Sequence, residues 1–516
     1  MSATDFWTWA AQQPQRLALV TPEYDEYSFG ALAERVNQVS HGLRALGLVR
    51  GDTISMVMHN CAEWVELALA VQQLGLYLTP INFHLTGPEI AYIIENSESK
   101  AFFAASRYAE ATAKAVEQLS FDRNACFVVD GAIAGFRPFE ELWEDQPTTA
   151  PERRAGGSMM LYTSGTTGRP KGVRKPLPET GPEEAAASSA LLASLFDIQA
   201  GVGAHLCAGP LYHAAPGGFG IGALHLGQTL VLMDKWTPEG TLERIDRYRI
   251  TASHMVPTMF IRMLDVPDEE KRKYDVSSLT NVIHAAAPCP EATKHRMIEW
   301  FGPVIYEYYA ATEGGGTYCN AHEWLEHPGT VGKPWPGSEV AIFDDEGNEL
   351  PPGEIGTIYM RSPMGEFEYY KDEEKTAKSR MHGMFTVGDM GFIDQDGWLF
   401  IRDRKIDMVI TGGVNIYPAE IEAVLVQQPL IRDVAVFGIP DDEKGEVVKA
   451  VVELHDGVEP NDSTRDAIMQ YVGENLAKYK WPRSIDFIDA LPRLPTGKLY
   501  KRFLRDKYWE GRERAV

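Results

Sequence analysis

The chain has 516 residues, which is too many for a single hydrophobic core, so we expect two or more domains. Its composition, with 44% hydrophobic and 24% charged residues, is typical of a globular protein, and no stretch approaches the roughly 20 apolar residues that span a membrane. The formal net charge of −24 argues against a general nucleic-acid surface, because such a surface needs a concentrated positive face.

The cysteines and the first residues of the chain point to the cytoplasm. The five cysteines are sparse and lack CxxC spacing, which indicates a reducing compartment and suggests neither a disulfide framework nor a zinc site. Residues 1–9 lack the basic region and the apolar core of a secretory signal. We therefore expect a cytoplasmic protein.

The first third of the chain alternates between helix and strand patterns. Apolar residues from Leu32 onward are spaced by four and three, which predicts one face of a helix capped by Ser28. Residues 53–58 then indicate a strand, residues 62–74 a second helix, and residues 77–80 the next strand. Such alternation implies parallel sheets with helices packed on their faces.

A loop rich in glycine and hydroxyl side chains follows an apolar strand predicted at residues 159–162. Its sequence, YTSGTTGRPKG, has three glycines that let backbone N–H groups approach an anion, while hydroxyl groups add donors and a lysine adds charge. It is not the usual P-loop, because Gly172 stands where that motif has a Ser or Thr for magnesium. The pattern predicts a polyphosphate site, followed by an exposed loop at residues 174–184. The candidate residues are Thr163, Ser164, Gly165, Thr166, Thr167, Gly168 and Lys171.

The pattern of predicted secondary structure changes twice in the last third of the chain. Residues 329–400 show short strands separated by turns, which predicts a mainly β subdomain. Beyond residue 405 a helix and strands follow one another in a small α+β pattern. We therefore predict an α/β protein: an N-terminal domain, residues 1–404, of parallel sheets, helices and the β subdomain, and a small mobile C-terminal domain, residues 405–516.

The loop at residues 162–172 resembles the phosphate-binding signature of the adenylate-forming superfamily, which includes acyl-CoA synthetases, luciferases and peptide-synthetase adenylation domains. Further motifs recur in the order of that family. They are YYAATE at residues 308–313, HAAAP at 284–288, FTVGD at 385–389, DRK at 403–405 and PRLPTGK at 492–498. The resemblance covers approximately residues 10–507.

The resemblance implies a nucleotide site that binds ATP and Mg²⁺. Tyr309 would pack near the adenine, Thr312 would hydrogen-bond the α-phosphate, and Glu313 would hold Mg²⁺, a hard cation that prefers oxygen ligands. Asp389 would accept hydrogen bonds from the ribose hydroxyls, with Arg404 as the second ribose contact. The remaining nucleotide-site residues would be Ala287, Pro288, Tyr308 and Ala310, the last of which replaces the commoner glycine.

By the same resemblance the C-terminal domain carries the catalytic lysine. Lys498 would bridge the substrate carboxylate and the α-phosphate, neutralising charge as the two approach. The domain would then rotate about a pivot two residues after the motif arginine, at Ile406, where Asp or Lys is common. The effect of Ile406 at this position, like that of Ala310 in the Thr-Glu motif, is left open by the sequence.

Further segments resemble the CoA ligases of the superfamily. Residues 411–420 (TGGVNIYPAE) would border a CoA tunnel with Gly412, Gly413 and Tyr417. His213 would gate or contact the acid, although a structural histidine beside the pocket is an equal alternative. The other acyl-pocket residues would be Gly218, His284, Ala285 and Ala286, whose small neighbours suggest room for a medium or long apolar, aromatic or polycyclic acid.

The implied activity is that of an ATP-dependent acid–thiol ligase, with a carboxylic acid, ATP and coenzyme A as substrates and no nucleic-acid partner. The alternatives are transfer of the acyl group to an amine or to a carrier-protein pantetheine, a luciferase-like oxidation, and a non-catalytic nucleotide-binding module. The acid and the oligomeric state are left open, with a homodimer as one alternative.

Overall fold

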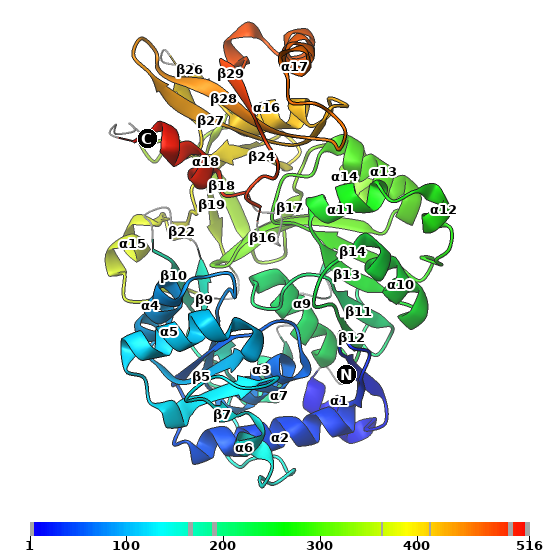
Figure 1. The fold of residues 1–516 in the computed structure, drawn as a ribbon, viewed down its shortest axis with the longest axis vertical. Coiled ribbons are helices and arrows are strands. Elements are labelled where there is room, and N and C mark those ends of the chain that lie inside the picture. Colours follow the sequence, from blue (N-terminus) through cyan, green and yellow to red (C-terminus); the bar gives the residue numbers. More distant parts are fainter. Residues whose placement is uncertain are drawn as a thin grey trace.

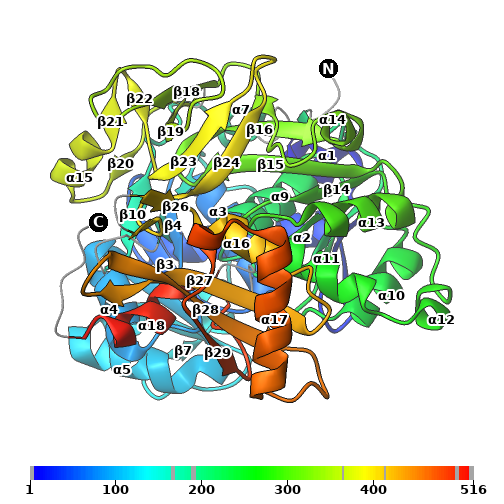
Figure 2. The same cartoon turned by 90° about the horizontal axis from the view of Figure 1, so that it is seen from above.

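The computed structural model describes residues 5–163, 169–187, 193, 195–362, 365–411, 414–493 and 499–510. They form a large N-terminal body and a smaller C-terminal part that lies across one end of it (Figures 1 and 2). The mixed α/β fold that the alternating pattern predicts is confirmed. Within the described part, no helix is long and apolar enough to cross a bilayer.

The first sheet of the body is parallel throughout, in the order β7-β6-β5-β3-β4-β8. Helices α2 and α3 pack on one face and α4 and α5 on the other, because successive strand residues point to opposite faces. The strands are β3 (Thr53–Val57), β4 (Tyr77–Pro80), β5 (Ser99–Ala105), β6 (Cys126–Val129), β7 (Arg137–Pro138) and β8 (Ser158–Met159), and the helices are α2 (Phe29–Ala45), α3 (Ala62–Leu74), α4 (Gly87–Asn96), α5 (Ala109–Leu119) and α6 (Glu140–Trp143).

The second sheet has the order β17-β16-β15-β14-β13-β11-β12-β1-β2 and is parallel from β1 to β15. Helices α10, α11 and α13 pack on one face. The strands are β1 (Leu17–Val20), β2 (Glu26–Ser28), β11 (Ala204–Cys207), β12 (Thr229–Leu232), β13 (Ala252–Met255), β14 (Asn281–His284), β15 (Ile305–Ala311), β16 (Gly314–Asn320) and β17 (Lys333–Pro334). The helices are α1 (Phe6–Gln12), α7 (Pro182–Ala185), α9 (Ala214–His225), α10 (Pro238–Tyr248), α11 (Pro257–Leu264), α12 (Asp268–Lys271), α13 (Glu291–Phe301) and α14 (Ala321–Glu326).

Helices α3 and α9 lie between these two sheets and share one hydrophobic core with both of them. Residues of α9 are apolar and buried around most of the helix, as expected of a helix enclosed between layers. The body is therefore layered helix–sheet–helix–sheet–helix. The carboxyl ends of the parallel strands, where ligands usually bind in such sheets, lie toward the C-terminal part (Figure 1).

Smaller antiparallel sheets connect the body to the C-terminal part. One consists of β9 (Leu161–Thr163), β10 (Lys171–Arg174) and β20 (Glu368–Tyr369). The predicted β subdomain follows, with strand order β21-β22-β19-β23-β24 and β18 beside β19. Its elements are β18 (Glu339–Phe343), β19 (Gly356–Arg361), α15 (Glu373–Lys378), β21 (Arg380–Met381), β22 (Met384–Phe385), β23 (Asp389–Ile393) and β24 (Leu399–Arg404).

The C-terminal part has its own sheet and its own core. Its elements are β25 (Val409–Thr411), β26 (Val414–Ile416), α16 (Pro418–Leu425), β27 (Ile431–Asp441), β28 (Gly445–Leu454), α17 (Asp462–Asn475), β29 (Ser484–Ile488) and α18 (Lys501–Arg505). The chain leaves the β subdomain at Arg404 and pairs in this sheet from Val409 onward. The division of the chain into domains at residue 404 stays a prediction, and this change of sheet is consistent with it.

The exposed loop expected over residues 174–184 is shorter in the structure, because only residues 175–181 lie outside helices and strands. Arg174 still belongs to β10, and α7 begins at Pro182, which is buried. Arg50 donates a hydrogen bond to the backbone oxygen of Pro178, and Arg154 pairs with Glu183. Proline and glycine therefore mark a packed turn here, not a free loop.

Candidate functional site

Two adjacent strands present the predicted Thr-Glu motif at the carboxyl end of the second sheet. Strand β15 ends at Ala311, and β16 begins at Gly314, so Thr312 and Glu313 form the turn between them. The register of the pair shifts between Ala310 and Ala311, which is an irregularity of the kind that re-aims side chains near a site. The motif is therefore held by a buried hairpin, and Glu313 is only 5% exposed.

Three of the residues predicted for the nucleotide site contact one another. The hydroxyl of Tyr309 donates to Oδ2 of Asp389 over 2.7 Å, and Nε of Arg404 lies 3.3 Å from Oδ1 of the same carboxylate. Asp389 and Arg404 face each other because they are paired in register between β23 and β24. Burial, followed by the charge of Asp389, raises the pKa of Tyr309 well above its usual value, so its hydroxyl stays a donor.

Glu313 is oriented by a residue that the sequence did not single out. The hydroxyl of Tyr369 donates to Oε1 of Glu313 over 2.7 Å. Burial and the Glu313 carboxylate raise the pKa of Tyr369, which keeps this donor protonated. The ammonium of Lys375 lies 4.6 Å from the centre of the Tyr369 ring. One oxygen of Glu313 is thus fixed, while the other accepts no hydrogen bond from the described residues.

The lysine of the predicted phosphate loop is paired with a carboxylate. Strands β9 and β10 pair antiparallel, and Lys171 faces Thr163 across this hairpin. Nζ of Lys171 lies 2.5 Å from Oδ2 of Asp372, and this hydrogen bond lowers the pKa of Asp372. The five loop residues Ser164, Gly165, Thr166, Thr167 and Gly168 lie outside the described residues.

Tyr369, Asp372 and Lys375 had only a weak signal in the sequence. They follow one another within the segment YYKDEEK, where short spacing of tyrosine, acid and lysine is also typical of a solvated turn. What brings Tyr369 to the site is the pairing of β20 with β10, in which Tyr369 faces Val173. Such long-range pairing is not visible in the local pattern.

The glycines predicted to make room for the acid have different surroundings. His213 occupies the N-cap position of α9 without a side-chain cap hydrogen bond, and Gly218 has no atom of the described residues within 4 Å of the position that a Cβ would take. A Cβ on Gly217 would lie 2.5 Å from the backbone oxygen of Leu211, and one on Gly220 would lie 3.2 Å from a methyl carbon of Leu211. Of these three glycines only Gly218 borders open space, while the other two serve close packing.

His284 does not face α9, contrary to its predicted place in the acyl pocket. Its side chain is fully buried against Phe260 on the α11 side of the sheet, 3.6 Å from Oε2 of Glu307. Glu307 is itself paired with the buried ammonium of Lys294 over 2.6 Å. The reason is strand alternation, since the preceding residue, Ile283, packs on the α9 side.

The residues after His284 form the predicted small segment at the end of β14. Ala285 is buried, Ala286 is exposed with a φ of 75°, and Ala287 and Pro288 are at least partly accessible. A positive φ on a residue other than glycine is uncommon and occurs where the surrounding structure fixes the backbone. The segment therefore presents backbone and methyl groups at the edge where Thr312 also lies.

Aromatic and histidine side chains fill the space between α9 and the second sheet. The ring of Phe219 lies 5.3 Å from that of His254 and 6.1 Å from that of Tyr308, whose hydroxyl lies 3.3 Å from Nε2 of His254. Burial lowers the pKa of His254 to about 3 and that of His205 to about 4, so both are neutral. This cluster was not predicted, because its members come from four separate segments of the chain.

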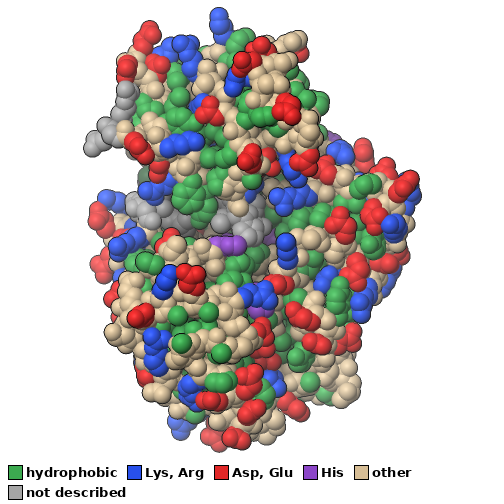
Figure 3. Space-filling view, viewed as in Figure 1, with side chains coloured by type: hydrophobic (Ala, Val, Ile, Leu, Met, Phe, Trp, Pro, Cys, Tyr) green, Lys and Arg blue, Asp and Glu red, His purple; other side chains and the backbone are tan. Residues whose placement is uncertain are grey.

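The C-terminal part approaches the body close to α9. Burial, followed by an electrostatic contribution from Tyr500, raises the pKa of Tyr212. Tyr417 precedes α16, whose backbone at Ala419 donates to Asp403 over 2.8 Å. Lys498, Gly412 and Gly413 lie outside the described residues. In space-filling view the surface is hollowed between the C-terminal part and the body, with histidine and basic side chains along the hollow (Figure 3).

The hinge predicted at Ile406 falls in a turn between β24 and β25. The backbone N–H groups of Asp407 and Met408 both donate to the backbone oxygen of Arg404, over 2.9 and 3.2 Å. Ile406 is half-buried in this turn.

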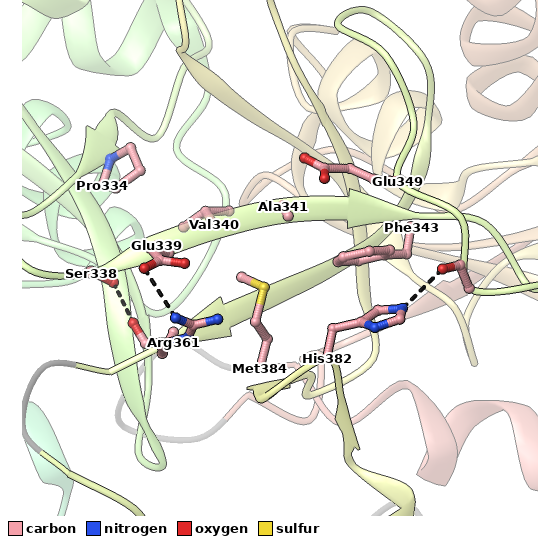
Figure 4. Close-up of a pocket in the computed structure, with 11 residues that line it drawn as sticks. Pro334, Ser338, Glu339, Val340, Ala341, Phe343, Glu349, Arg361, His382 and Met384 are labelled. Atoms are coloured by element: carbon pink, nitrogen blue, oxygen red, sulfur yellow. Dashed lines mark hydrogen bonds and ion pairs between the residues drawn. The ribbon is translucent and has the colours of Figure 1, made fainter.

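A separate pocket of about 710 Å³ lies on β18 and β19 (Figure 4). In this pocket Arg361 pairs with Glu339 over 3.2 Å, and His382 contacts the backbone oxygen of Gly347. None of the predicted site residues lines it. It is therefore not the candidate site.

Comparison with known proteins gives matches over nearly the whole chain. The family profile described as AMP-binding enzyme matches residues 6–370, and the one described as AMP-binding enzyme C-terminal domain matches residues 420–498. The long-chain-fatty-acid–CoA ligase FadD13 of Mycobacterium tuberculosis is 32% identical, over 97% of this chain and 97% of that protein. The fatty acid–[acyl-carrier-protein] ligase ScoC of Streptomyces coeruleorubidus is 30% identical, over 98% of this chain and 96% of that protein.

Among solved structures, the amide bond synthetase McbA from Marinactinospora thermotolerans superposes with a TM-score of 0.83 at 25% identity, covering 98% of this chain and 99% of that one. The first profile spans well over half of the chain, and relatives of 30% identity or more cover nearly all of it. The chain therefore belongs to the AMP-binding enzyme family, within the adenylate-forming superfamily of ligases.

Proposed function

We propose that this protein is an ATP-dependent acyl-CoA ligase. A carboxylic acid and ATP would give an acyl-adenylate and pyrophosphate, and the thiol of coenzyme A would then displace AMP to form the thioester. The observation that carries the proposal is the contact of Tyr309, Asp389 and Arg404, together with Glu313 in the turn of the hairpin to which Tyr309 belongs. These are the side chains that the family resemblance assigns to adenine, ribose and metal.

The geometry supports specific roles in the adenylation step. Asp389 keeps acceptor capacity beyond its two contacts, because a carboxylate accepts about four hydrogen bonds, and this suits ribose hydroxyls. Arg404 would hold the ribose from the other side. Thr312, beside Glu313 in the turn, would donate to the α-phosphate, and Lys171 would exchange Asp372 for a phosphate. Stabilising the charge of the transferring phosphate is the main contribution that such a site makes.

The residues present fit a magnesium ion that is bound together with ATP. Within the described ranges, no group of three acidic, histidine or cysteine side chains could hold a metal alone. Glu313 offers one carboxylate oxygen that accepts no hydrogen bond there, and Mg²⁺ is commonly held by one or two carboxylates plus substrate phosphates. When bound, the ion would neutralise phosphate charge.

The C-terminal part would supply the remaining groups. Tyr500, two residues after Lys498 in the chain, acts electrostatically on Tyr212 of the body, which supports a place for this region beside the site. Lys498 as the activating lysine, Gly412, Gly413 and Tyr417 as the CoA tunnel, and Ile406 as the hinge are parts of the proposal. They rest on the family resemblance.

The acid that we propose is a medium or long apolar acid, or an aromatic one. Gly218 opens from α9, and the layer behind it is aromatic and apolar, with Phe219 and Tyr308. Apolar and aromatic walls with few polar groups are typical of sites for such ligands. The long-chain-fatty-acid specificity in the name of FadD13 is in keeping with this proposal.

A second candidate differs in the acyl acceptor. ScoC is named for transfer to an acyl-carrier protein and McbA for amide bond synthesis, and both cover almost the whole chain. An acceptor thiol on a carrier protein, or an amine, is therefore the alternative to coenzyme A.

A two-step assay tests these proposals. Pyrophosphate release is measured over a panel of fatty, aromatic and polycyclic acids with ATP and Mg²⁺, and the best acid is then offered coenzyme A, a carrier protein or an amine. We expect acid-dependent release and a CoA thioester. Release without a CoA product would favour the second candidate, and absence of release with any acid would favour a non-catalytic nucleotide-binding module.

A further inference from the structure

A second lysine of the phosphate hairpin points to the same site as Lys171. Residues 171, 173 and 175 lie on one side of β10 and its continuation, because side chains alternate along a strand. Val173 packs in the core that contains Tyr309 and Tyr369, so this side faces the Glu313 hairpin. Lys175 lies one residue beyond β10. Its side chain is therefore directed to the same side of the strand as that of Lys171.

The surroundings of Lys175 confirm this direction. Its Nζ lies 3.8 Å from the position that a Cβ on Gly314 would take, next to Glu313 in the chain. The backbone of Lys175 is fixed by the hydroxyl of Tyr77, which donates to its carbonyl oxygen over 2.8 Å. Burial lowers the pKa of the Lys175 ammonium, and the charge of Glu313 acts in the opposite direction.

Lys175 differs from its neighbours in having no partner among the residues that the structure describes. Lys171 is paired with Asp372, and Lys375 lies against the Tyr369 ring. The ammonium of Lys175 makes no ion pair within 4.0 Å and no hydrogen bond to the part of the chain that the structure describes. A partly buried charge without a partner is unfavourable, so a site that retains one is suited to an anion that arrives with the ligand.

The charge balance around Glu313 points the same way. Three lysines (171, 175 and 375) lie with two carboxylates (Glu313 and Asp372), which leaves a positive excess in a chain whose net charge is −24. A polyphosphate carries more negative charge than one magnesium ion neutralises. The extra lysines would balance the remainder, while Glu313 and the phosphate oxygens would share the metal.

We infer that Lys175 binds the β- and γ-phosphates of ATP, and hence the pyrophosphate product, as a cation additional to Lys171. The inference rests on the proposed function, because it names a further residue of the proposed ATP site. AMP lacks both of these phosphates, so Lys175 would distinguish ATP from AMP and would not contribute to binding of the adenosine part.

Nucleotide binding in the absence of acid tests this inference, because no turnover then occurs. Calorimetric titration of the purified full chain with Mg²⁺ and either ATP or AMP is compared for wild type, Lys175→Met and Lys175→Arg. Methionine keeps the apolar stem and removes the charge. We expect Lys175→Met to weaken ATP binding by about tenfold or more, as loss of a hydrogen bond to a charged group usually does, and to leave AMP binding within about twofold. Lys175→Arg should restore most of the ATP affinity.

The matched control is Lys378→Met, which removes the same charge from the exposed side of α15, where Lys378 pairs only with Glu374. It should change neither affinity. Unchanged ATP binding by Lys175→Met, or equal loss of ATP and AMP binding, would overturn the inference, and Lys175→Gln repeats the measurement should the methionine variant not fold. A wild-type chain that binds neither nucleotide would overturn the proposed function itself.

Discussion

At the scale of single residues, the carboxylate proposed to hold the metal is positioned before any metal binds. Tyr369 donates to one oxygen of Glu313, and its ring is covered by the ammonium of Lys375. A hydrogen bond of this kind restricts the carboxylate to one orientation and leaves the second oxygen for the ion. Residues that hydrogen-bond to a metal ligand are often nearly as important for metal affinity as the ligand itself.

Tyr369→Phe should therefore weaken magnesium binding without removing a ligand. The variant loses only the hydroxyl that donates to Glu313, so we expect the Mg²⁺ concentration for half-maximal pyrophosphate release to rise by about tenfold. Glu313→Gln should raise it further. The measurement is a magnesium titration at saturating ATP and acid.

The neighbouring tyrosine provides the control for this prediction. The hydroxyl of Tyr370 donates to the exposed Glu98, away from Glu313, so Tyr370→Phe should leave the magnesium dependence unchanged. An identical magnesium titration curve for Tyr369→Phe and wild type would show that the hydrogen bond does not position the metal ligand.

Lys498→Ala should lose most adenylate formation while ATP still binds. Removing a charge that acts mainly in the transition state usually costs about 10²–10³-fold in rate. Thioester formation from pre-made acyl-adenylate and coenzyme A should survive largely intact, because the proposed role of Lys498 ends with adenylation. Wild-type rates of acid-dependent pyrophosphate exchange in the variant would remove Lys498 from this role.

Separate sequence motifs assigned three residues to one site, and their side chains do lie together, while their roles in nucleotide binding stay a prediction. Asp389, Arg404 and Tyr309 were identified separately and are found in contact. His284 was misplaced because it precedes the small-residue segment but, as the last residue of β14, points to the opposite face. Tyr369 was missed because only the pairing of β20 with β10 brings it to Glu313.

At the scale of secondary-structure elements, a buried histidine connects three helices. Nδ1 of His225, the last residue of α9, accepts the backbone N–H of Phe6 at the start of α1 over 3.2 Å. Its Nε2 therefore carries the proton and donates to Gln72 of α3, 2.9 Å away. Burial lowers the pKa of His225 to about 4.

This contact predicts a loss of stability in mild acid. The folded-state pKa of about 4 lies below the ordinary value of 6.5, so the unfolded chain takes up the proton first. The stabilisation is complete above pH 6.5 and decreases as the pH falls toward 4, by about 3 kcal/mol at most. The difference in unfolding free energy between wild type and His225→Gln should therefore shrink over this range, as followed by urea unfolding.

His41→Gln is the matched variant, since the ring of His41 only contacts the backbone oxygen of Thr149 near the surface. The difference in unfolding free energy between His41→Gln and wild type should not change with pH. If the difference in unfolding free energy between His225→Gln and wild type does not change with pH, His225 is not neutral in the folded chain or does not hold α1 against α9.

The helices and strands of the first third were predicted closely, because local physics determines them. Residues 62–74 form α3, and Ser28 caps α2 by accepting the backbone N–H of Ala31. The segment after the phosphate loop was misjudged because part of it packs against the body: Arg154 pairs with Glu183, and a Cβ on Gly156 would lie 3.0 Å from a side-chain carbon of Pro178. Composition alone does not distinguish a packed turn from a free one.

At the scale of the whole molecule, residues 405–407 link the body to the C-terminal part. An ion pair attaches this link to the body, and another attaches it to the C-terminal part. Lys405 pairs with Asp345 of the β subdomain, and Asp407 pairs with Arg505 of α18 over 3.4 Å. Ile406 lies between these two attachments. A rotation of the C-terminal part that keeps both pairs must therefore change the backbone at or beside Ile406, which supports the hinge predicted there.

Ile406→Pro should separate the two half-reactions. Proline fixes φ near −65° and removes a backbone N–H, so it would restrict the turn without touching the nucleotide site or the acyl site. Because the substitution would restrict only the link, we expect acid-dependent pyrophosphate exchange to persist in the variant. Thioester formation, which would require the rotated orientation, should lose most of its rate. Ile406→Ala, which leaves the backbone free, should retain both activities. Equal loss of both half-reactions in Ile406→Pro would indicate general damage, and retention of both would place the pivot at another residue of the link.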